Sequence, residues 1–173
     1  MESKIHRSKD VSCPFKGCGQ HFVKASALIL HLESGACPSR VDRARIDRFV
    51  RQLDKHNLIT KPSGLVTWDG TRYDDTTSVT YTATSKCFNG SGYECYLCHR
   101  EFQTLPALNQ HLSSPKHQDE QYICPLASCR VNFRTLSGFC QHVESQRCGV
   151  SRFRAVQNAI DNVVNGGRLL LRS

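Results

Sequence analysis

The stretch from Cys124 to Cys148, CPLASCRVNFRTLSGFCQHVESQRC, carries the pattern that decides the fold. Two cysteines separated by four residues are followed after twelve residues by His142, and after five more by Cys148. Thiolate sulfur and imidazole nitrogen are ligands of tetrahedral zinc, which a short hairpin and the following helix supply in pairs. Four protein ligands leave no open coordination position, so the pattern indicates a structural ion and not a catalytic one.

The same ligand pattern occurs at two further places in the chain. One stretch repeats the separations and again closes on cysteine, whereas the other has two residues between its cysteines and closes on histidine. The predicted ligands of three Zn²⁺ ions are Cys13, Cys18, His31 and Cys37; Cys95, Cys98, His111 and His117; and Cys124, Cys129, His142 and Cys148. The alternative for Cys37 and Cys148 is that they are ordinary buried cysteines, but no other residue would complete either set.

Apolar residues at fixed positions support the same fold. In each stretch an aromatic residue lies four positions after the second cysteine, and a second apolar residue lies three positions before the histidine. These pairs are Phe22 with Leu28, Phe102 with Leu108, and Phe133 with Phe139. Each pair is expected to form a small core beside the metal. Because structural zinc contributes roughly 10–16 kcal/mol to such units, we expect them to unfold without it.

The first and third stretches align without a gap at an offset of 111 residues. The matched residues include the metal ligands and Ser26, Glu33, Ser137 and Glu144. An amphipathic helix is expected after each stretch, over 39–57 and 151–167, with Ser39 or Ser151 as cap and Asn57 or Gly166–Gly167 as stop. Their apolar stripes are Ile46, Phe49, Val50 and Leu53, and Phe153, Val156, Ile160, Val163 and Val164. We expect each stripe to pack on its own metal unit or on a neighbour, the alternative being a flexible amphipathic tail.

The sequence therefore predicts a small zinc-stabilised α+β protein with three ββα zinc fingers. Fingers 1, 2 and 3 are expected over 11–37, 93–117 and 122–148, with 60–92 as the joining segment. In that segment Asp69–Gly70 indicates a β-hairpin turn, and alternation at Val79, Tyr81 and Ala83 indicates a strand. The alternative is a Thr/Ser-rich linker, with Trp68 as either a hairpin core residue or an anchor for a partner.

Composition bounds the environment of the protein. The chain has 173 residues, 23 Lys and Arg against 15 Asp and Glu, and a formal net charge of +8. No apolar segment resembling a secretory signal follows Met1, and no apolar run is long enough to span a bilayer. We therefore expect reduced thiols in the nucleus or cytoplasm, and no membrane partner. The positive charge favours polyanions as partners, nucleic acid foremost.

Base reading by the finger helices is not favoured by their sequences. The positions that contact bases in DNA-reading fingers hold mostly short side chains, with two glutamines as the residues suited to adenine. These positions are Lys24, Ser26, Ala27 and Leu30; Thr104, Pro106, Ala107 and Gln110; and Thr135, Ser137, Gly138 and Gln141. Phosphate contacts are expected instead from Lys24, Arg40, Arg43, Arg45, Arg48, Arg51 and Lys55. The alternative for these cations is the solvated face of an amphipathic helix.

The stretch KCFNGSGYECYLCHREFQTLPALNQHLSSPKHQ, the cysteine-closed finger after it and RFRAVQNAIDNVVNGGRLL resemble a large group of fungal Cys2His2-type zinc-finger proteins. That resemblance implies zinc binding and the finger fold, without an assigned mechanism. The spacing of finger 2 is also similar to that of matrin-type fingers that bind double-stranded RNA.

Other motifs carry less weight. CYLCH at 95–99 matches a haem-attachment pattern, but the same thiols complete finger 2. Cys87 and Cys140 are left over, and no residue set indicates catalysis or a small-molecule substrate. We therefore expect a non-enzymatic protein that binds nucleic acid, with a zinc-finger adaptor for protein partners as the alternative.

Overall fold

The computed structural model describes residues 11–62 and 81–165, which fall into two compact units. The paired unit contains the described residues of 1–76 and 120–173, and the single-finger unit contains those of 77–119. Each unit has its own hydrophobic core. The first and last predicted fingers therefore belong to one unit, although more than eighty residues separate them in the chain.

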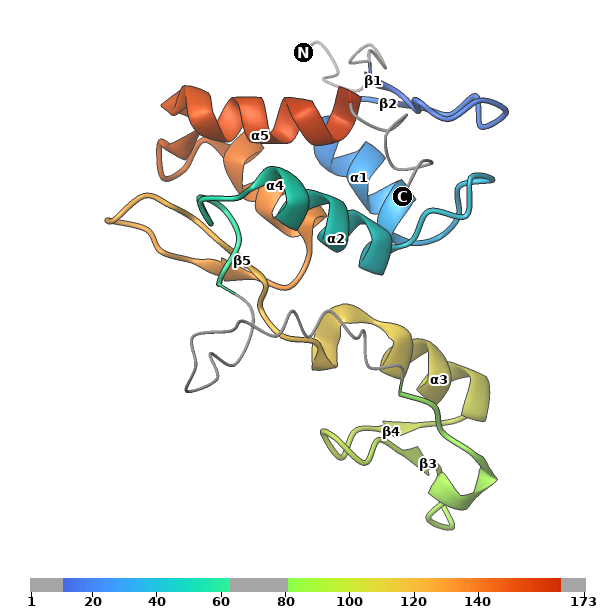
Figure 1. Cartoon of the computed structure of the whole chain (residues 1–173). Coiled ribbons are helices and arrows are strands. Elements are labelled where there is room, and N and C mark those ends of the chain that lie inside the picture. Colours follow the sequence, from blue (N-terminus) through green and yellow to red (C-terminus); the bar gives the residue numbers. More distant parts are fainter. Residues whose placement is uncertain (1–10, 63–80, 166–173) are drawn as a thin grey trace, which may run out of the picture. The chain divides into compact units, whose positions relative to one another are not determined.

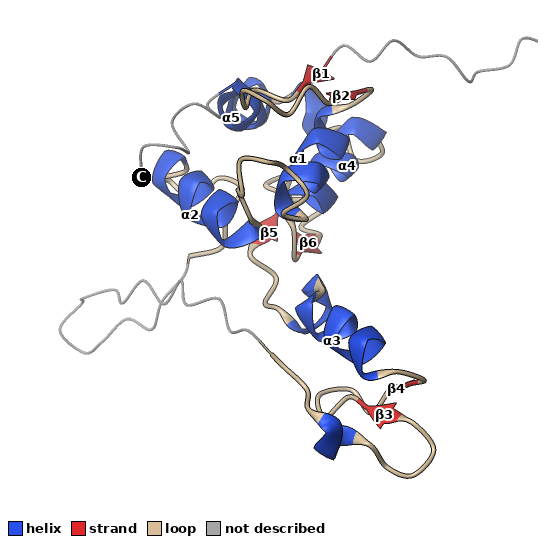
Figure 2. Ribbon diagram, turned by 90° about the vertical axis from the view of Figure 1, so that its right-hand side faces the viewer, coloured by secondary structure: helices blue, strands red, loops and turns tan. Residues whose placement is uncertain are grey.

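The paired unit is built on two ββα fingers. In finger 1, β1 (Val11–Ser12) pairs antiparallel with β2 (His21–Phe22), and α1 (Ala25–Glu33) follows. In finger 3, β5 (Tyr122–Ile123) pairs with β6 (Asn132–Phe133), and α4 (Leu136–Ser145) follows. Helices α1 and α4 lie side by side and form the most extensive contact between elements of this unit (Figures 1 and 2).

Two further helices cover this pair. Helix α2 (Arg43–Leu53) contacts α1, and α5 (Arg154–Asn165), which follows the 3₁₀ turn η3 (Val150–Arg152), contacts both α1 and α2. Both helices begin later than predicted. Asp42, not Ser39, caps α2, because its carboxylate accepts the Arg45 N–H at 2.9 Å. The hydroxyl of Ser39 accepts the Val41 N–H instead, and the second proposed cap, Ser151, lies inside η3.

The amphipathic stripes supply much of the shared core. Ile46, Phe49 and Val50 of α2 and Val156 and Ile160 of α5 are buried against residues of α1 and α4. Two predicted stripe residues are exceptions: Leu53 is 43% exposed at the last turn of α2, and Phe153 is 51% exposed just before α5. Asn57 has the left-handed φ of 50° expected of a stop residue, but it lies beyond the helix end at Leu53.

The segment after α2 joins the hairpin of finger 3, which the sequence did not indicate. Ile123 donates its N–H to the carbonyl of Ile59, and Lys61 donates its N–H to the carbonyl of Gln121. The carboxylate of Asp54 fixes this segment, because it accepts hydrogen bonds from the backbone N–H groups of residues 58–60. Residues 59–61 therefore extend the β5–β6 hairpin of finger 3 and belong to the paired unit.

The single-finger unit contains finger 2. Strands β3 (Tyr93–Glu94) and β4 (Glu101–Phe102) pair antiparallel, and α3 (Leu105–Ser113) and the 3₁₀ turn η2 (Pro115–His117) follow (Figure 2). A 3₁₀ turn η1 (Ser85–Cys87) precedes them.

The unit begins upstream of the predicted finger boundary. Ala83 is buried against Leu108 and Leu112, and its backbone N–H and carbonyl bond to the Asn109 side chain at 2.7 and 3.2 Å. The predicted hairpin at Asp69–Gly70, the strand residue Val79 and Trp68 lie outside the described residues.

Candidate metal centres and the surfaces beside them

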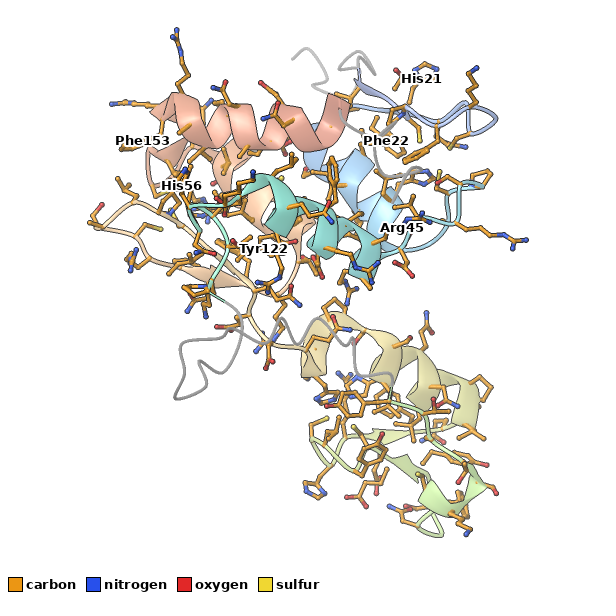
Figure 3. All side chains as sticks on the ribbon, viewed as in Figure 1. His21, Phe22, Arg45, His56, Tyr122 and Phe153 are labelled. Atoms are coloured by element: carbon orange, nitrogen blue, oxygen red, sulfur yellow. The ribbon has the colours of Figure 1, made fainter. Side chains whose placement is uncertain are left out.

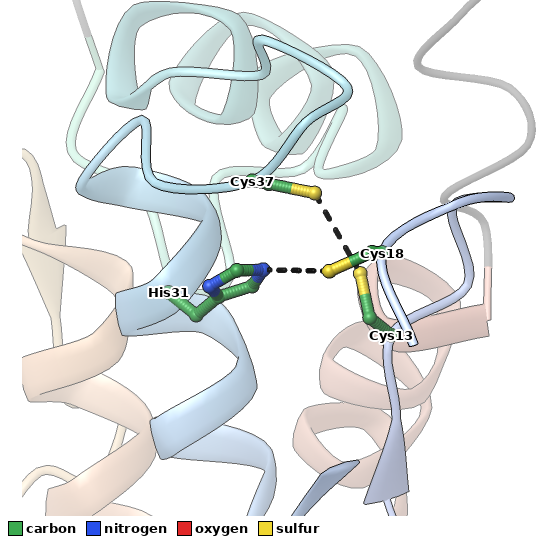
Figure 4. A group of neighbouring side chains, drawn as sticks. All are labelled: Cys13, Cys18, His31 and Cys37. Carbon is green, nitrogen blue, oxygen red and sulfur yellow. Dashed lines mark hydrogen bonds between the residues drawn. The ribbon is translucent and has the colours of Figure 1, made fainter. Parts of the chain in front are cut away.

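Each of the three predicted ligand sets converges on one point. Within each set, the ligand atoms lie within 4.8 Å of one another. In finger 1, Cys13 and Cys18 come from the hairpin, His31 from α1 and Cys37 from the loop after it (Figure 4). The structure therefore groups the same twelve side chains that the spacing singled out.

The separations fit a tetrahedral zinc ion. With Zn–S near 2.3 Å and Zn–N near 2.0–2.1 Å, tetrahedral geometry places two sulfurs about 3.8 Å apart and sulfur and nitrogen about 3.5 Å apart. The Sγ–Sγ distance is 3.8 Å for Cys13–Cys37 and for Cys124–Cys148. The Sγ–Nε2 distance is 3.3 Å for Cys18–His31 and 3.6 Å for Cys129–His142. A sulfur-rich set of this size suits zinc and not a hard cation such as Mg²⁺.

Finger 2 has the Cys2His2 version of the same arrangement. Cys95 Sγ lies 3.4 Å from His117 Nε2, and Cys98 Sγ lies 3.4 Å from His111 Nε2. The two Nε2 atoms are 2.9 Å apart, so a central ion would separate the rings by a few tenths of an ångström.

In all three fingers a half-buried phenylalanine packs against the first histidine ring and fixes its orientation. The centroid distances are 5.1 Å for Phe22–His31, 4.7 Å for Phe102–His111 and 5.0 Å for Phe133–His142.

The thiols within the Cys2HisCys sites of fingers 1 and 3 differ in acidity. Burial raises the pKa of Cys13 and that of Cys124 to about 12. A thiol with so high a pKa is protonated at neutral pH unless a cation displaces the proton. In the same two sites the pKa shifts the other way for one thiol each: against the effect of burial, hydrogen bonds with Ser39 lower the pKa of Cys37, and a backbone hydrogen bond with Val131 lowers that of Cys129.

The comparisons with known proteins agree with this chemistry. Residues 93–117 match a family model described as a zinc finger of C2H2 type. No curated protein and no solved structure matches the chain. The match to finger 2 and the three Cys/His groups define a zinc-finger protein. Among the described residues, no helix has the length and apolar character needed to cross a membrane.

Helices α1 and α4 of the paired unit cap each other's N-terminus. The backbone N–H and the hydroxyl of Ser26 donate to the Glu144 carboxylate at 3.0 and 2.6 Å. Reciprocally, the Leu136 N–H donates to the Glu33 carboxylate at 2.8 Å, and the hydroxyl of Ser137 donates to it as well. The offset of 111 residues that aligns the fingers also relates Ser26 to Ser137 and Glu33 to Glu144.

These contacts occupy positions from which a DNA-reading finger contacts bases. Ser26 and Ser137 are used in the reciprocal caps, and Ala27 and Gly138 are half-buried. Leu30, Gln141 and Lys24 remain exposed, and Lys24 lies 4.0 Å from the Glu144 carboxylate. The helix faces of fingers 1 and 3 are thus largely committed to each other.

The structure divides the seven predicted phosphate-binding residues into two groups. Arg40, Arg48 and Lys55 are exposed, as is Lys24. Arg43, Arg45 and Arg51 are half-buried. The guanidinium of Arg51 donates to the carbonyl of Lys61 and to the Gln121 side chain, both at 3.3 Å. Arg51 therefore holds the segment after α2 in place, whereas the exposed group remains accessible to a polyanion.

The acidic residues are distributed differently from the basic ones. Glu33 and Asp47 are buried, and the carboxylates of Asp54 and Glu144 are engaged by backbone N–H groups. Residues 77–119 contain three Lys and Arg and three Asp and Glu, so the net charge of +8 belongs entirely to the residues of the other unit. Within the described part of that unit, burial removes the carboxylates of Glu33 and Asp47 from the outer surface.

Proposed function

We propose that this zinc-finger protein binds nucleic acid through phosphate contacts made by the paired unit, in the nucleus or cytoplasm, with three structural Zn²⁺ ions. The observation that supports backbone contact over base reading is the pairing of α1 with α4. A recognition helix enters the major groove with its N-terminal residues facing the bases. In fingers 1 and 3, the N-terminal turns of these helices face Glu144 and Glu33 of the partner helix.

The charge distribution supports the same proposal. Lys and Arg provide the sequence-independent part of nucleic-acid affinity. The surface of the paired unit presents Arg40, Arg48 and Lys55. A zinc-finger adaptor for protein partners is the alternative. The neutral single-finger unit would suit that role, since Phe88 and Tyr96 are 51% and 47% exposed on it.

We also propose that the paired unit consists of two copies of one finger–helix module. The support is that the 111-residue offset maps Ser26 onto Ser137 and Glu33 onto Glu144, so the contact between Ser26 and Glu144 corresponds to the contact between Ser137 and Glu33. A contact made by equivalent residues on both sides is the arrangement of a two-fold symmetric dimer interface.

Fluorescence anisotropy with two duplexes of unrelated sequence, as DNA and as RNA, tests the proposed function. We expect equal affinity for both sequences and a steep loss of affinity between about 50 and 200 mM salt. The double variant Arg48→Ala with Lys55→Ala is expected to weaken binding to both sequences alike. Its matched control is Lys86→Ala with Lys116→Ala in the single-finger unit. If the protein binds neither these duplexes nor a single strand at the lower salt concentration, the proposal is refuted and the adaptor is favoured.

A further inference from the structure

A cavity of about 370 Å³ lies beside the zinc site of finger 3, where the chain leaves the finger and enters α5. It is lined by Leu126, Cys148, Gly149, Arg152 and Phe153. Its volume falls in the range of roughly 300–1,000 Å³ that is typical of small-ligand sites. The cavity is open rather than enclosed, so it suits one group of a larger molecule better than a free ligand that must be surrounded.

The side chain of Phe153 is exposed to solvent, whereas its backbone is held by hydrogen bonds. Phe153 donates its N–H to the carbonyl of Val150 at 3.1 Å, and its own carbonyl accepts the N–H groups of Val156 and Gln157. Its side chain is nevertheless 51% exposed at the surface of the paired unit (Figure 3). Burying this ring would be favourable, and base stacking on exposed aromatic rings of this kind contributes to the binding of single strands.

Arg152 lines the cavity together with Phe153, and two more arginines, Arg147 and Arg154, lie close to them in the sequence. Arg147, Arg152 and Arg154 are exposed, and none of their guanidinium groups forms an ion pair with a residue that the structure describes. The acids nearest to them in sequence are Glu144, which is directed to Ser26, and Asp161, which is exposed on α5. Among the described residues no ion pair engages these three arginines, and their positive charge is complementary to phosphate.

Finger 1 has no such combination at the equivalent positions. By the 111-residue offset, Leu126 corresponds to Phe15, Arg152 to Val41 and Phe153 to Asp42. Phe15 and Val41 are buried in the core, and Asp42 caps α2. The first module thus uses these positions for packing and capping, whereas the second presents an exposed ring and an arginine beside a cavity.

We propose that this cavity binds one unpaired nucleotide of a single-stranded nucleic acid. The base stacks on the Phe153 ring, its phosphate pairs with Arg152, and the neighbouring phosphates are contacted by Arg147 and Arg154. This inference rests on the proposed function. It adds that the nucleic acid is single-stranded at this site, and it names the residues that recognise the single strand.

Binding of labelled single strands of about twelve uridines or thymidines tests the site by anisotropy. Phe153→Ala is expected to weaken binding roughly 5- to 150-fold, the range measured for loss of one stacked base. Phe153→Trp should retain affinity because it keeps a stacking ring, and Phe153→Leu should lose it although it remains apolar. The matched control is Phe88→Ala, which removes an equally exposed ring from the single-finger unit. Because the Phe153 ring is exposed, these variants should keep the zinc content and circular dichroism of the parent.

Three further measurements distinguish a single-strand site from a duplex site, from a free-nucleotide site and from no site. Binding of a duplex should be insensitive to Phe153→Ala, and Arg152→Ala should reduce the slope of log K against log salt by about 0.7 for single strands. Uridine monophosphate should bind far more weakly than the single strand. Equal affinity would mean that the site binds a free nucleotide and not a strand. If the parent binds single strands and Phe153→Ala binds them equally well, the site is wrong and the proposed function stands. If the parent binds neither strands nor duplexes at low salt, the proposed function itself fails.

Discussion

Glu33 and Glu144 have the same role at different depths in the protein. Each carboxylate accepts hydrogen bonds at the N-terminus of the opposite helix, but Glu33 is 6% exposed whereas Glu144 is only half-buried. A helix N-terminus has N–H groups without partners inside the helix, and it attracts negative charge. Removal of a cap leaves these donors unpaired, and the cost is greatest where water cannot replace the lost acceptor.

Glu33→Ala is therefore expected to lower the free energy of unfolding by about 1–3 kcal/mol, because the N–H of Leu136 and the side chain of Ser137 lose a buried acceptor. Glu144→Ala is the matched variant and should cost less, because water reaches its site. Urea denaturation of zinc-loaded protein measures both. An equal or greater cost for Glu144→Ala would contradict the assigned burial.

A second buried carboxylate has a pH-dependent role. Asp47 accepts a hydrogen bond from the Tyr122 hydroxyl and joins α2 to the hairpin of finger 3. Burial raises the pKa of Asp47 from 3.8 to about 6, although the bond from Tyr122 opposes this shift. The folded protein therefore holds this proton more strongly than the unfolded chain, and the stability that it contributes declines as pH rises from about 4 to 6.

Replacement of the carboxyl group by an amide removes this titration. Relative to the parent, Asp47→Asn is expected to gain about 1 kcal/mol of stability when pH is raised from 5 to 7, because only the parent must ionise a buried acid. Zinc-ligand protonation affects both proteins alike and cancels in the difference. Urea denaturation at each pH gives the comparison, and a difference that stays constant with pH would show that Asp47 titrates normally.

At the scale of elements, the sequence predicts the fingers well and the contacts between them poorly. Ligand spacing and the Phe–His–apolar pattern define each ββα unit, because metal geometry requires neighbours within a short stretch of chain. The periodicity of α2 also indicates its buried residues Ile46, Phe49 and Val50. No local pattern shows that residues 59–61 pair with β5, or that Glu33 reaches Ser137, because these contacts depend on long-range packing. One sequence signal does bear on the contact between Glu33 and Ser137. The 111-residue offset aligns Ser26 with Ser137 and Glu33 with Glu144, so both fingers carry the same pair of residues.

The packing role of α2 can be tested by a charge on its buried face. Phe49→Asp is expected to destabilise the paired unit by several kcal/mol, because an unpaired charge would replace a side chain that is 6% exposed. Leu53→Asp, on the same helix but 43% exposed, is the matched control and should have little effect. Hydrogen exchange should show loss of protection in both α1 and α4 for Phe49→Asp alone. Unchanged protection would mean that α2 is not part of this core.

On the scale of the whole molecule, zinc and packing act together differently in the two units. Fingers 1 and 3 share one hydrophobic core, and each helix caps the other, so loss of either metal site removes a packing partner from the other. Finger 2 has a separate core around Leu108 and Leu112. This organisation explains how two small metal units form a larger folded body, and it accounts for the covered helix faces on which the proposed function depends.

Native mass spectrometry of the reduced protein during a chelator titration tests this account most directly. The parent should carry three zinc ions, and Cys98→Ser, which disables finger 2, should carry two. The double variant Cys98→Ser with Cys37→Ser should retain only the ion of finger 3. That ion should be released at a lower chelator concentration than either ion of the Cys98→Ser protein. Fewer than three ions in the parent, or retention of the finger 3 ion with undiminished affinity, would contradict a shared zinc-dependent core.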